Sequence, residues 1–178
     1  RERLQGNWGV VDVEDCIKAT ESLLASGKAN KDSVAIIGSS ASGFTALGCL
    51  LSTDIFKIGA CKYAVTDLLS MANSTHRFEE FYLDYLIGNI QNHLKKYKER
   101  SPIESVNKIY APLILFHGLK DKVISYKDSV AIKNELLKRE IPVEINLFEK
   151  EGHGFKNGKT KVKVLKDTEA FFRKHLNI

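Results

Sequence analysis

Cysteine is scarce in this sequence, and its number is odd. The three cysteines are Cys16, Cys49 and Cys61, which stand among apolar residues and lack CxxC spacing. A disulfide framework or a zinc site needs cysteines in pairs at short intervals. The pattern therefore argues against both and predicts three buried thiols, which favours a reducing, cytoplasmic compartment.

Methionine is rarer still, because Met71 is the single residue of its type, and residue 1 is Arg. We therefore expect the natural N-terminus to be missing and the chain to be the C-terminal part of a longer protein. Long apolar runs are absent too: none approaches the roughly 20 residues that a membrane-spanning helix needs, and no segment resembles a signal peptide. We expect no membrane partner.

Low-complexity linkers and internal repeats are also absent, and 43% hydrophobic with 28% charged residues is the composition of a globular domain. We expect residues 1–178 to form a single, partial domain. The net charge is +5, but the lysines are dispersed. Their densest groups, at residues 95–98 and 159–166, have helical spacing, which favours solvated helix faces over nucleic-acid binding.

Short apolar runs alternate with helical patterns along the chain. The apolar runs predict strands at residues 33–37, 57–65, 113–116 and 142–148. Helical spacing predicts helices at residues 10–26, 41–51, 76–90, 92–100, 127–139 and 161–176. Such alternation requires right-handed crossovers and predicts an α/β fold with a doubly wound, mostly parallel sheet. The first run has the pattern of a central strand that is covered on both faces.

Chemically active residues follow three of these predicted strands directly. In open α/β sheets, ligands bind beyond the carboxyl ends of the strands. The segments at this edge are GSSASG at residues 38–43, HGLKD at residues 117–121 and EGHGF at residues 151–155. These three segments are therefore the candidates for a functional site.

The first segment has the pattern of a nucleophile elbow, a strained strand-to-helix turn that exposes a serine. The turn requires small residues two positions before and two positions after the serine. Ser40 meets this requirement, since Gly38 and Ser42 occupy these positions. Ser39 does not, because Ile37 precedes it by two residues.

Asp121 and His153 supply the other two groups that a reactive serine needs. A hydroxyl becomes a good nucleophile when a histidine removes its proton and a carboxylate orients that histidine. The order Ser, Asp, His along the chain is that of α/β-hydrolases. We predict Ser40 as nucleophile, His153 as general base and Asp121 as its carboxylate, with the backbone N–H of Ala41 as an oxyanion donor. This chemistry needs no metal or cofactor.

Each of these residues has a plainer interpretation when taken alone. Glycine-flanked serines are common, Asp121 fits a turn or a helix cap, and His153 fits a loop histidine between two glycines. Their combination favours the catalytic interpretation. His117 ends a predicted strand near the site, and we expect it to have a structural hydrogen-bonding role.

Several groups of residues, spread over the whole chain, occur together in one known family. They are RLQGNWG at 3–9 leading into Asp12 and Asp15, the elbow at 38–43, THRF at 75–78 with YLD at 82–84, SPI at 101–103, HG at 117–118 with Asp121, and EGHGF at 151–155. In this combination the chain resembles the catalytic domain of the prolyl oligopeptidase family, particularly its acylaminoacyl-peptidase and dipeptidyl-peptidase-like branch.

The resemblance implies an α/β-hydrolase fold and a serine peptidase that acts on short peptides, with Ser40, Asp121 and His153 at the triad positions. It also implies a β-propeller ahead of this domain, and first sheet strands and a second oxyanion donor, a tyrosine hydroxyl, outside this chain. The family's elbow usually reads GGSAGG, so Ser39 and Ser42 replace two glycines. We expect the isolated chain to hydrolyse substrates weakly.

Two other functions are compatible with the same residues. The first is an esterase or thioesterase of the same fold, which the triad would serve equally well. The second is a non-catalytic, hydrolase-like binding module. A sheet that lacks its first strands would also expose an edge, which predicts association of the fragment into homo-oligomers.

Overall fold

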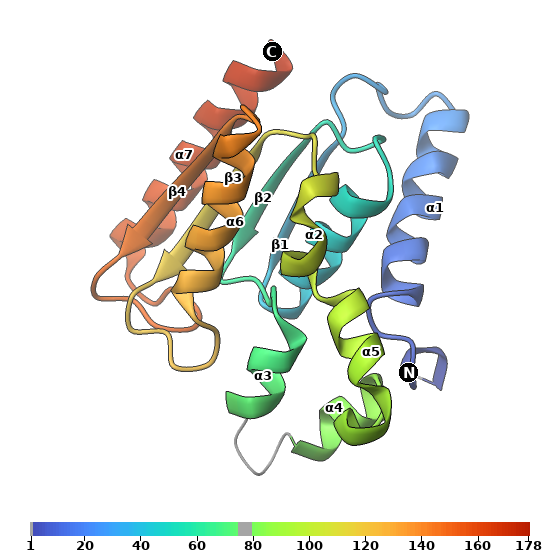
Figure 1. The fold of residues 1–178 in the computed structure, drawn as a ribbon. Helices are drawn as coiled ribbons and strands as arrows, with labels where there is room; N and C mark the ends of the chain where they lie inside the picture. The colour runs from blue at the N-terminus through green and yellow to red at the C-terminus, as the bar shows by residue number, and fades with distance from the viewer. Residues whose placement is uncertain (1, 75–79) are drawn as a thin grey trace.

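The computed structural model describes residues 2–74 and 80–178. In this part of the chain, a parallel sheet is flanked by helices (Figure 1). The strands lie side by side in the order β1 (Ala35–Ser39), β2 (Ile58–Lys62), β3 (Leu113–Gly118) and β4 (Val143–Phe148), and each neighbouring pair is parallel. The predicted α/β class and parallel sheet are confirmed.

Helices pack on both faces of this sheet. The helical segments are η1 (Glu2–Leu4), α1 (Val11–Ala25), α2 (Ala41–Ser52), α3 (Leu68–Ser74), α4 (Glu80–Leu86), α5 (Ile90–Arg100), η2 (Pro102–Lys108), α6 (Tyr126–Lys138) and α7 (Gly158–Leu176). Helices α2 and α6 cover one face, α1 packs against α2, and α7 covers the opposite face (Figure 1).

Alternate residues of β3 show how the two faces bury their side chains. Leu113 and Leu115 point toward the α2 and α6 side, where they pack with Leu47 and Ile132. Ile114 and Phe116 point toward α7 and pack with the side chains of that helix. All six residues of β3 are buried, as expected for a parallel strand with helices on both sides.

The predicted covering of the first strand on both faces is wrong for this chain. β1 is the edge strand of the sheet in the described residues, and Ile37 is 57% exposed. Helix α7 packs mainly against β2 and β3, and the side chain of Ile37, at the edge of the sheet, is left more than half exposed. The apolar run gave no information on the position of the strand within the sheet.

The helical excursion between β2 and β3 differs from its prediction. Residues 75–79, where the predicted helix 76–90 and the THRF motif begin, lie outside the described residues. Helix α4 ends at Leu86, because Gly88 has a φ of 114° and Asn89 caps the start of α5 by accepting a hydrogen bond from the Gln91 N–H. Helix α3 was not predicted. The excursion lies beyond the carboxyl ends of the strands (Figure 1).

The prediction of three buried cysteines is correct for two of them. Cys49 and Cys61 are buried, and burial raises the pKa of both thiols to about 12. Cys16 is exposed, because the buried stripe of α1 passes through Val13 and Ile17 and leaves Cys16 at its margin. All three are free thiols.

Candidate active site

Ser40 lies on a sharp turn between β1 and α2. Its φ of 52° is in the left-handed region, which residues with a side chain rarely adopt. Two hydrogen bonds to the end of β2 and the loop after it hold the turn: the Ser40 N–H donates to the Lys62 carbonyl at 3.0 Å, and the Ser40 carbonyl accepts from the Val65 N–H at 3.3 Å. This is the geometry expected of a nucleophile elbow.

The residues on either side of Ser40 show why the turn requires small side chains. A Cβ atom at Gly38 would collide with the backbone carbonyl of Ser42. The Ser42 hydroxyl accepts a hydrogen bond from the Ser39 N–H at 2.9 Å and donates one to the Ser39 carbonyl at 2.9 Å. The serine that replaces a glycine at position 42 is therefore bound to the backbone of the turn.

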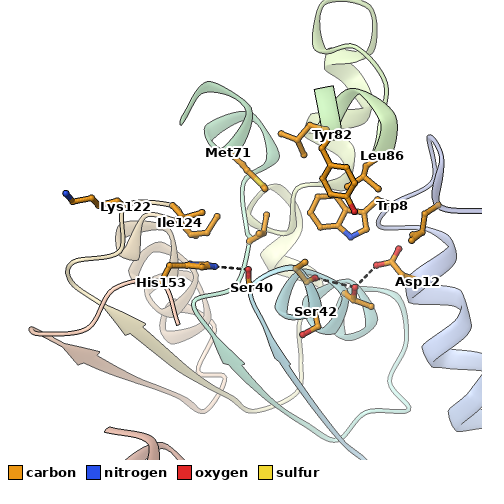
Figure 2. Close-up of a pocket in the computed structure, with 16 residues that line it drawn as sticks. Trp8, Asp12, Ser40, Ser42, Met71, Tyr82, Leu86, Lys122, Ile124 and His153 are labelled. Atoms are coloured by element: carbon orange, nitrogen blue, oxygen red, sulfur yellow. Dashed lines mark hydrogen bonds between the residues drawn. The ribbon is translucent and has the colours of Figure 1, made fainter. Parts of the chain in front are cut away.

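The structure brings Ser40, His153 and Asp121 together from loops that follow β1, β4 and β3. The Ser40 Oγ lies 2.8 Å from the His153 Nε2 (Figure 2). On the other side of the ring, the His153 Nδ1 lies 2.9 Å from the Asp121 Oδ2. Because a carboxylate only accepts hydrogen bonds, the His153 Nδ1 must carry the proton. The Nε2 is then free to accept the proton of the Ser40 hydroxyl.

The Asp121 carboxylate is fully buried and accepts four hydrogen bonds. Its Oδ1 accepts from the N–H groups of Val123 and Ile124 at 2.8 and 2.9 Å, and its Oδ2 accepts from His153 at 2.9 Å and from His117 at 3.2 Å. Burial alone would raise the pKa of Asp121. The hydrogen bonds outweigh that effect and hold the pKa well below its usual range.

The loops that carry Asp121 and His153 are joined by their backbones. The Lys120 N–H donates to the Glu151 carbonyl at 2.9 Å, and a Cβ atom at Gly118 would collide with that same carbonyl. The Glu151 carboxylate accepts from the N–H groups of Lys156 and Asn157, and the bond from Lys156 is the main cause of its lowered pKa. The HG and EGHGF motifs thus fix the distance between the two loops.

Tyr63 is a site residue that the sequence did not reveal. It follows β2 with a φ of 37°, and its ring centroid lies 5.0 Å from the ring of His153 and 5.0 Å from that of Phe155. The Tyr63 ring thus packs against the His153 ring in a T-shaped arrangement. Tyr63 lies inside the strand predicted at residues 57–65, whereas β2 ends at Lys62, so the rule that selected the residues after the other strands did not reach it.

An apolar cavity of about 680 Å³ opens beside Ser40. Ser40 lies between His153 on one side and the cavity wall that contains Trp8 and Leu86 on the other (Figure 2). The apolar part of this wall includes Trp8, Val65, Met71, Leu83, Leu86 and Ile124. Helices α3 and α4 supply three of these side chains, so the excursion between β2 and β3 forms part of the cavity.

The segment that precedes α1 places Trp8 in this wall. The Arg100 guanidinium donates to the carbonyls of Gly6 and Trp8 at 3.0 Å each, and the Trp8 ring lies 4.5 Å from the ring of Phe44. Asp12 accepts hydrogen bonds from the Gly9 N–H and from the Thr45 hydroxyl on α2. The RLQGNWG motif and Asp12 therefore act together to shape the cavity.

Across residues 2–74 and 80–178, no group of three or more His, Cys, Asp or Glu side chains is arranged to hold a metal ion. Over the same ranges, the structure contains no helix with the length and apolar character that would allow it to cross a membrane.

A serine on a strained strand-to-helix turn, hydrogen-bonded to a histidine that a buried carboxylate orients, is the arrangement of a serine hydrolase, and here an α/β-hydrolase fold carries it. Comparison with known proteins narrows this class. The chain belongs to the prolyl oligopeptidase family, whose sequence profile matches residues 1–178. The resemblance drawn from the motifs is thus confirmed.

Two solved structures illustrate the similarity. A puromycin-hydrolyzing peptidase of Mycobacterium tuberculosis has 39% sequence identity and a TM-score of 0.97, over 99% of this chain and 27% of its own. A puromycin hydrolase has 36% identity and a TM-score of 0.95, over 100% of this chain and 27% of its own.

More distant relatives have peptidase names. Dipeptidyl aminopeptidase BIII of Pseudoxanthomonas mexicana is 28% identical over 84% of this chain and 23% of its own length. Acylamino-acid-releasing enzyme 2 of Oryza sativa subsp. japonica is 24% identical over 99% of this chain and 24% of its own length. The chain thus spans about a quarter of the length of these relatives.

Proposed function

We propose that this chain is the catalytic part of a serine peptidase that hydrolyses short peptides through an acyl-enzyme. The observation that carries the proposal is the continuous line of hydrogen bonds from Ser40 to His153 at 2.8 Å and from His153 to Asp121 at 2.9 Å. Membership in the prolyl oligopeptidase family and the names of the relatives support a peptide substrate.

In the proposed reaction, the Ser40 Oγ attacks the substrate carbonyl while its proton moves to the His153 Nε2. Asp121 stays ionised and stabilises the imidazolium, because its hydrogen bonds keep its pKa low. His153 then protonates the leaving amine. Water, activated by His153, cleaves the acyl-enzyme and regenerates Ser40.

The Ala41 N–H is the proposed oxyanion donor on this chain. Ala41 is the first residue of α2, where a backbone N–H has no partner within the helix. Its position directly after the nucleophile points this donor toward the carbonyl oxygen that Ser40 attacks, and the N-terminal end of the helix dipole favours the negative charge that develops there.

The apolar cavity indicates which peptides the site would accept. With Trp8, Leu86 and Ile124 in its wall, it suits a large apolar side chain on the residue whose carbonyl is attacked. The cavity gives no preference between acylaminoacyl, dipeptidyl and oligopeptidase action. A β-propeller ahead of these residues in the full-length protein stays a prediction, as does cytoplasmic localisation.

The test compares matched amide and ester substrates with the full-length protein. We expect hydrolysis of an aminoacyl 4-nitroanilide, abolished in Ser40→Ala, and a kcat/KM for phenylalanyl substrates at least roughly tenfold above that for glycyl substrates, as a filled apolar pocket predicts. Cleavage of the 4-nitrophenyl ester without the anilide would identify an esterase. Peptide binding without cleavage of either substrate would identify a binding module.

A further inference from the structure

Asp121 has a second histidine partner that the reaction described above does not use. His117, near the end of β3, is fully buried. Its Nε2 lies 3.2 Å from the Asp121 Oδ2 and 3.1 Å from the Ile124 carbonyl oxygen. Its Nδ1 lies 2.8 Å from the Ser129 hydroxyl on α6. The line of hydrogen bonds that begins at Ser40 therefore continues past Asp121 to Ser129.

The partners of His117 determine where its proton resides. The Nε2 faces two oxygens that only accept, the Asp121 carboxylate and the Ile124 carbonyl, so it must carry a hydrogen. The Ser129 hydroxyl can donate to the Nδ1, which then needs no proton. A neutral imidazole satisfies every partner in this fully buried position, where a second charge would be costly.

We propose that His117 is a positioning residue for Asp121, and the inference rests on the proposed function of Ser40 and His153. The Asp121 Oδ2 receives hydrogen bonds from both histidines, so its direction is fixed from two sides. The His117 N–H also draws electron density from the carboxylate. It thereby moderates how strongly Asp121 attracts the proton on the His153 Nδ1.

Other charged groups around His117 come from neighbouring elements. Asp128, on the first turn of α6, is close enough to interact electrostatically with His117. Burial raises the pKa of Asp128, and the charge of Asp67 raises it further. His153 faces the same carboxylate from the loop after β4. All of these groups surround the hydrogen bond between His117 and Asp121.

Two amide substitutions of His117 distinguish a residue that donates a hydrogen bond to Asp121 from one that only fills space in the core. The amide nitrogen of glutamine can take the place of the histidine Nε2, whereas the shorter asparagine places its amide near the Nδ1. In the full-length protein, we expect His117→Gln to recover most of the wild-type kcat. We expect His117→Asn to lower kcat by about tenfold, the effect of losing one hydrogen bond to a charged group, with KM little changed.

The pH dependence of kcat/KM is a second readout. It would not change if His117 only filled space in the core. Without the donor, Asp121 attracts the imidazolium form of His153 more strongly, so the acid limb of the profile should move to higher pH in His117→Asn and not in His117→Gln. Equal kcat values and equal acid limbs in the two variants, both folded by thermal melting, would overturn the proposal.

A further variant keeps the test decisive if His117→Asn fails to fold. Ser129→Ala removes the hydroxyl that holds the Nδ1, and we expect a lower kcat at unchanged KM; an unchanged kcat would contradict the proposal. Ser40→Ala serves as the reference in all assays. Wild-type protein whose hydrolysis does not depend on Ser40 would refute the proposed function itself, which separates that failure from the failure of the role of His117.

Discussion

The side chain of Asp121 is buried, and yet it carries a charge that four hydrogen bonds compensate. Its low pKa has a thermodynamic consequence, because a group whose pKa is depressed in the folded state stabilises the fold only while it is ionised. The stabilisation is fully present above the unfolded-state value of about 3.9. It is lost progressively as the pH falls below that value.

Substitution of this carboxylate should therefore remove part of the acid sensitivity of the fold. We expect Asp121→Asn to melt at a lower temperature than the wild type at pH 7, and the difference should shrink as the pH falls from 5 to 3. The measurement is thermal unfolding across this range. Asp32→Asn, which changes an exposed carboxylate, is the control. A difference that stays constant with pH would contradict the account.

The sequence predicted the main site residues because three features agreed: the types of the residues, their order along the chain and their positions after strands. Ser40, Asp121 and His153 follow strands and stand in an order that a known mechanism requires, and the structure places them within hydrogen-bonding distance of one another. The contact of Tyr63 with the His153 ring and the bond from His117 to Asp121 depend on packing between loops. Sequence spacing carries no information on such contacts.

At the scale of elements, the turn between β1 and α2 combines strain at Ser40 with close backbone approach at Gly38. The approach cannot relax easily, because the atom that a Cβ would meet is the backbone carbonyl of Ser42. The backbone hydrogen bonds of Ser40 with Lys62 and Val65 hold the turn from the other side.

Gly38→Ala should therefore destabilise the domain by roughly 1–3 kcal/mol, the cost of overpacking a tight site, and lower kcat/KM. Gly158→Ala is the matched control, since its Cβ would meet no atom within 4 Å at the start of α7. Its stability should be unchanged or slightly higher. Chemical denaturation of both variants, with activity assays, makes the comparison. Equal stabilities would argue against the close approach.

The pattern of apolar residues predicted which segments form helices and which form strands. It predicted less well where each element ends and which elements pack against it. The strands follow from short apolar runs, and the helices α1, α2, α6 and α7 follow from a spacing of apolar residues near 3.6. Helix α3 was missed because it is only seven residues long. The early end of α4 depends on Gly88, and the exposure of Ile37 depends on where other elements stop.

For the whole molecule, the uncovered edge at β1 has a consequence for association. β1 has no neighbour on its outer side in the described residues, and Ile37 exposes 57% of its surface there. An unpaired strand edge with an exposed apolar side chain is a template for pairing with another chain. A covered edge in the full-length protein would remove this tendency.

We expect the isolated chain of 178 residues to self-associate through this edge. Ile37→Lys should weaken the association, because a charge on an edge strand opposes pairing. Leu94→Lys, at a 49% exposed position on α5, is the control and should leave it unchanged. Sedimentation velocity over a range of concentrations measures the effect. A monomer at high concentration would show that the edge does not pair.

The central claim is that Ser40 is an activated nucleophile, and reaction with a fluorophosphonate tests it most directly. After digestion of the full-length protein, mass spectrometry should locate the adduct on Ser40. It should disappear in Ser40→Ala and His153→Ala and persist in Ser39→Ala, whose contacts in the turn are made by its backbone. A folded protein that stays unlabelled, or an adduct on Ser39, would contradict the account.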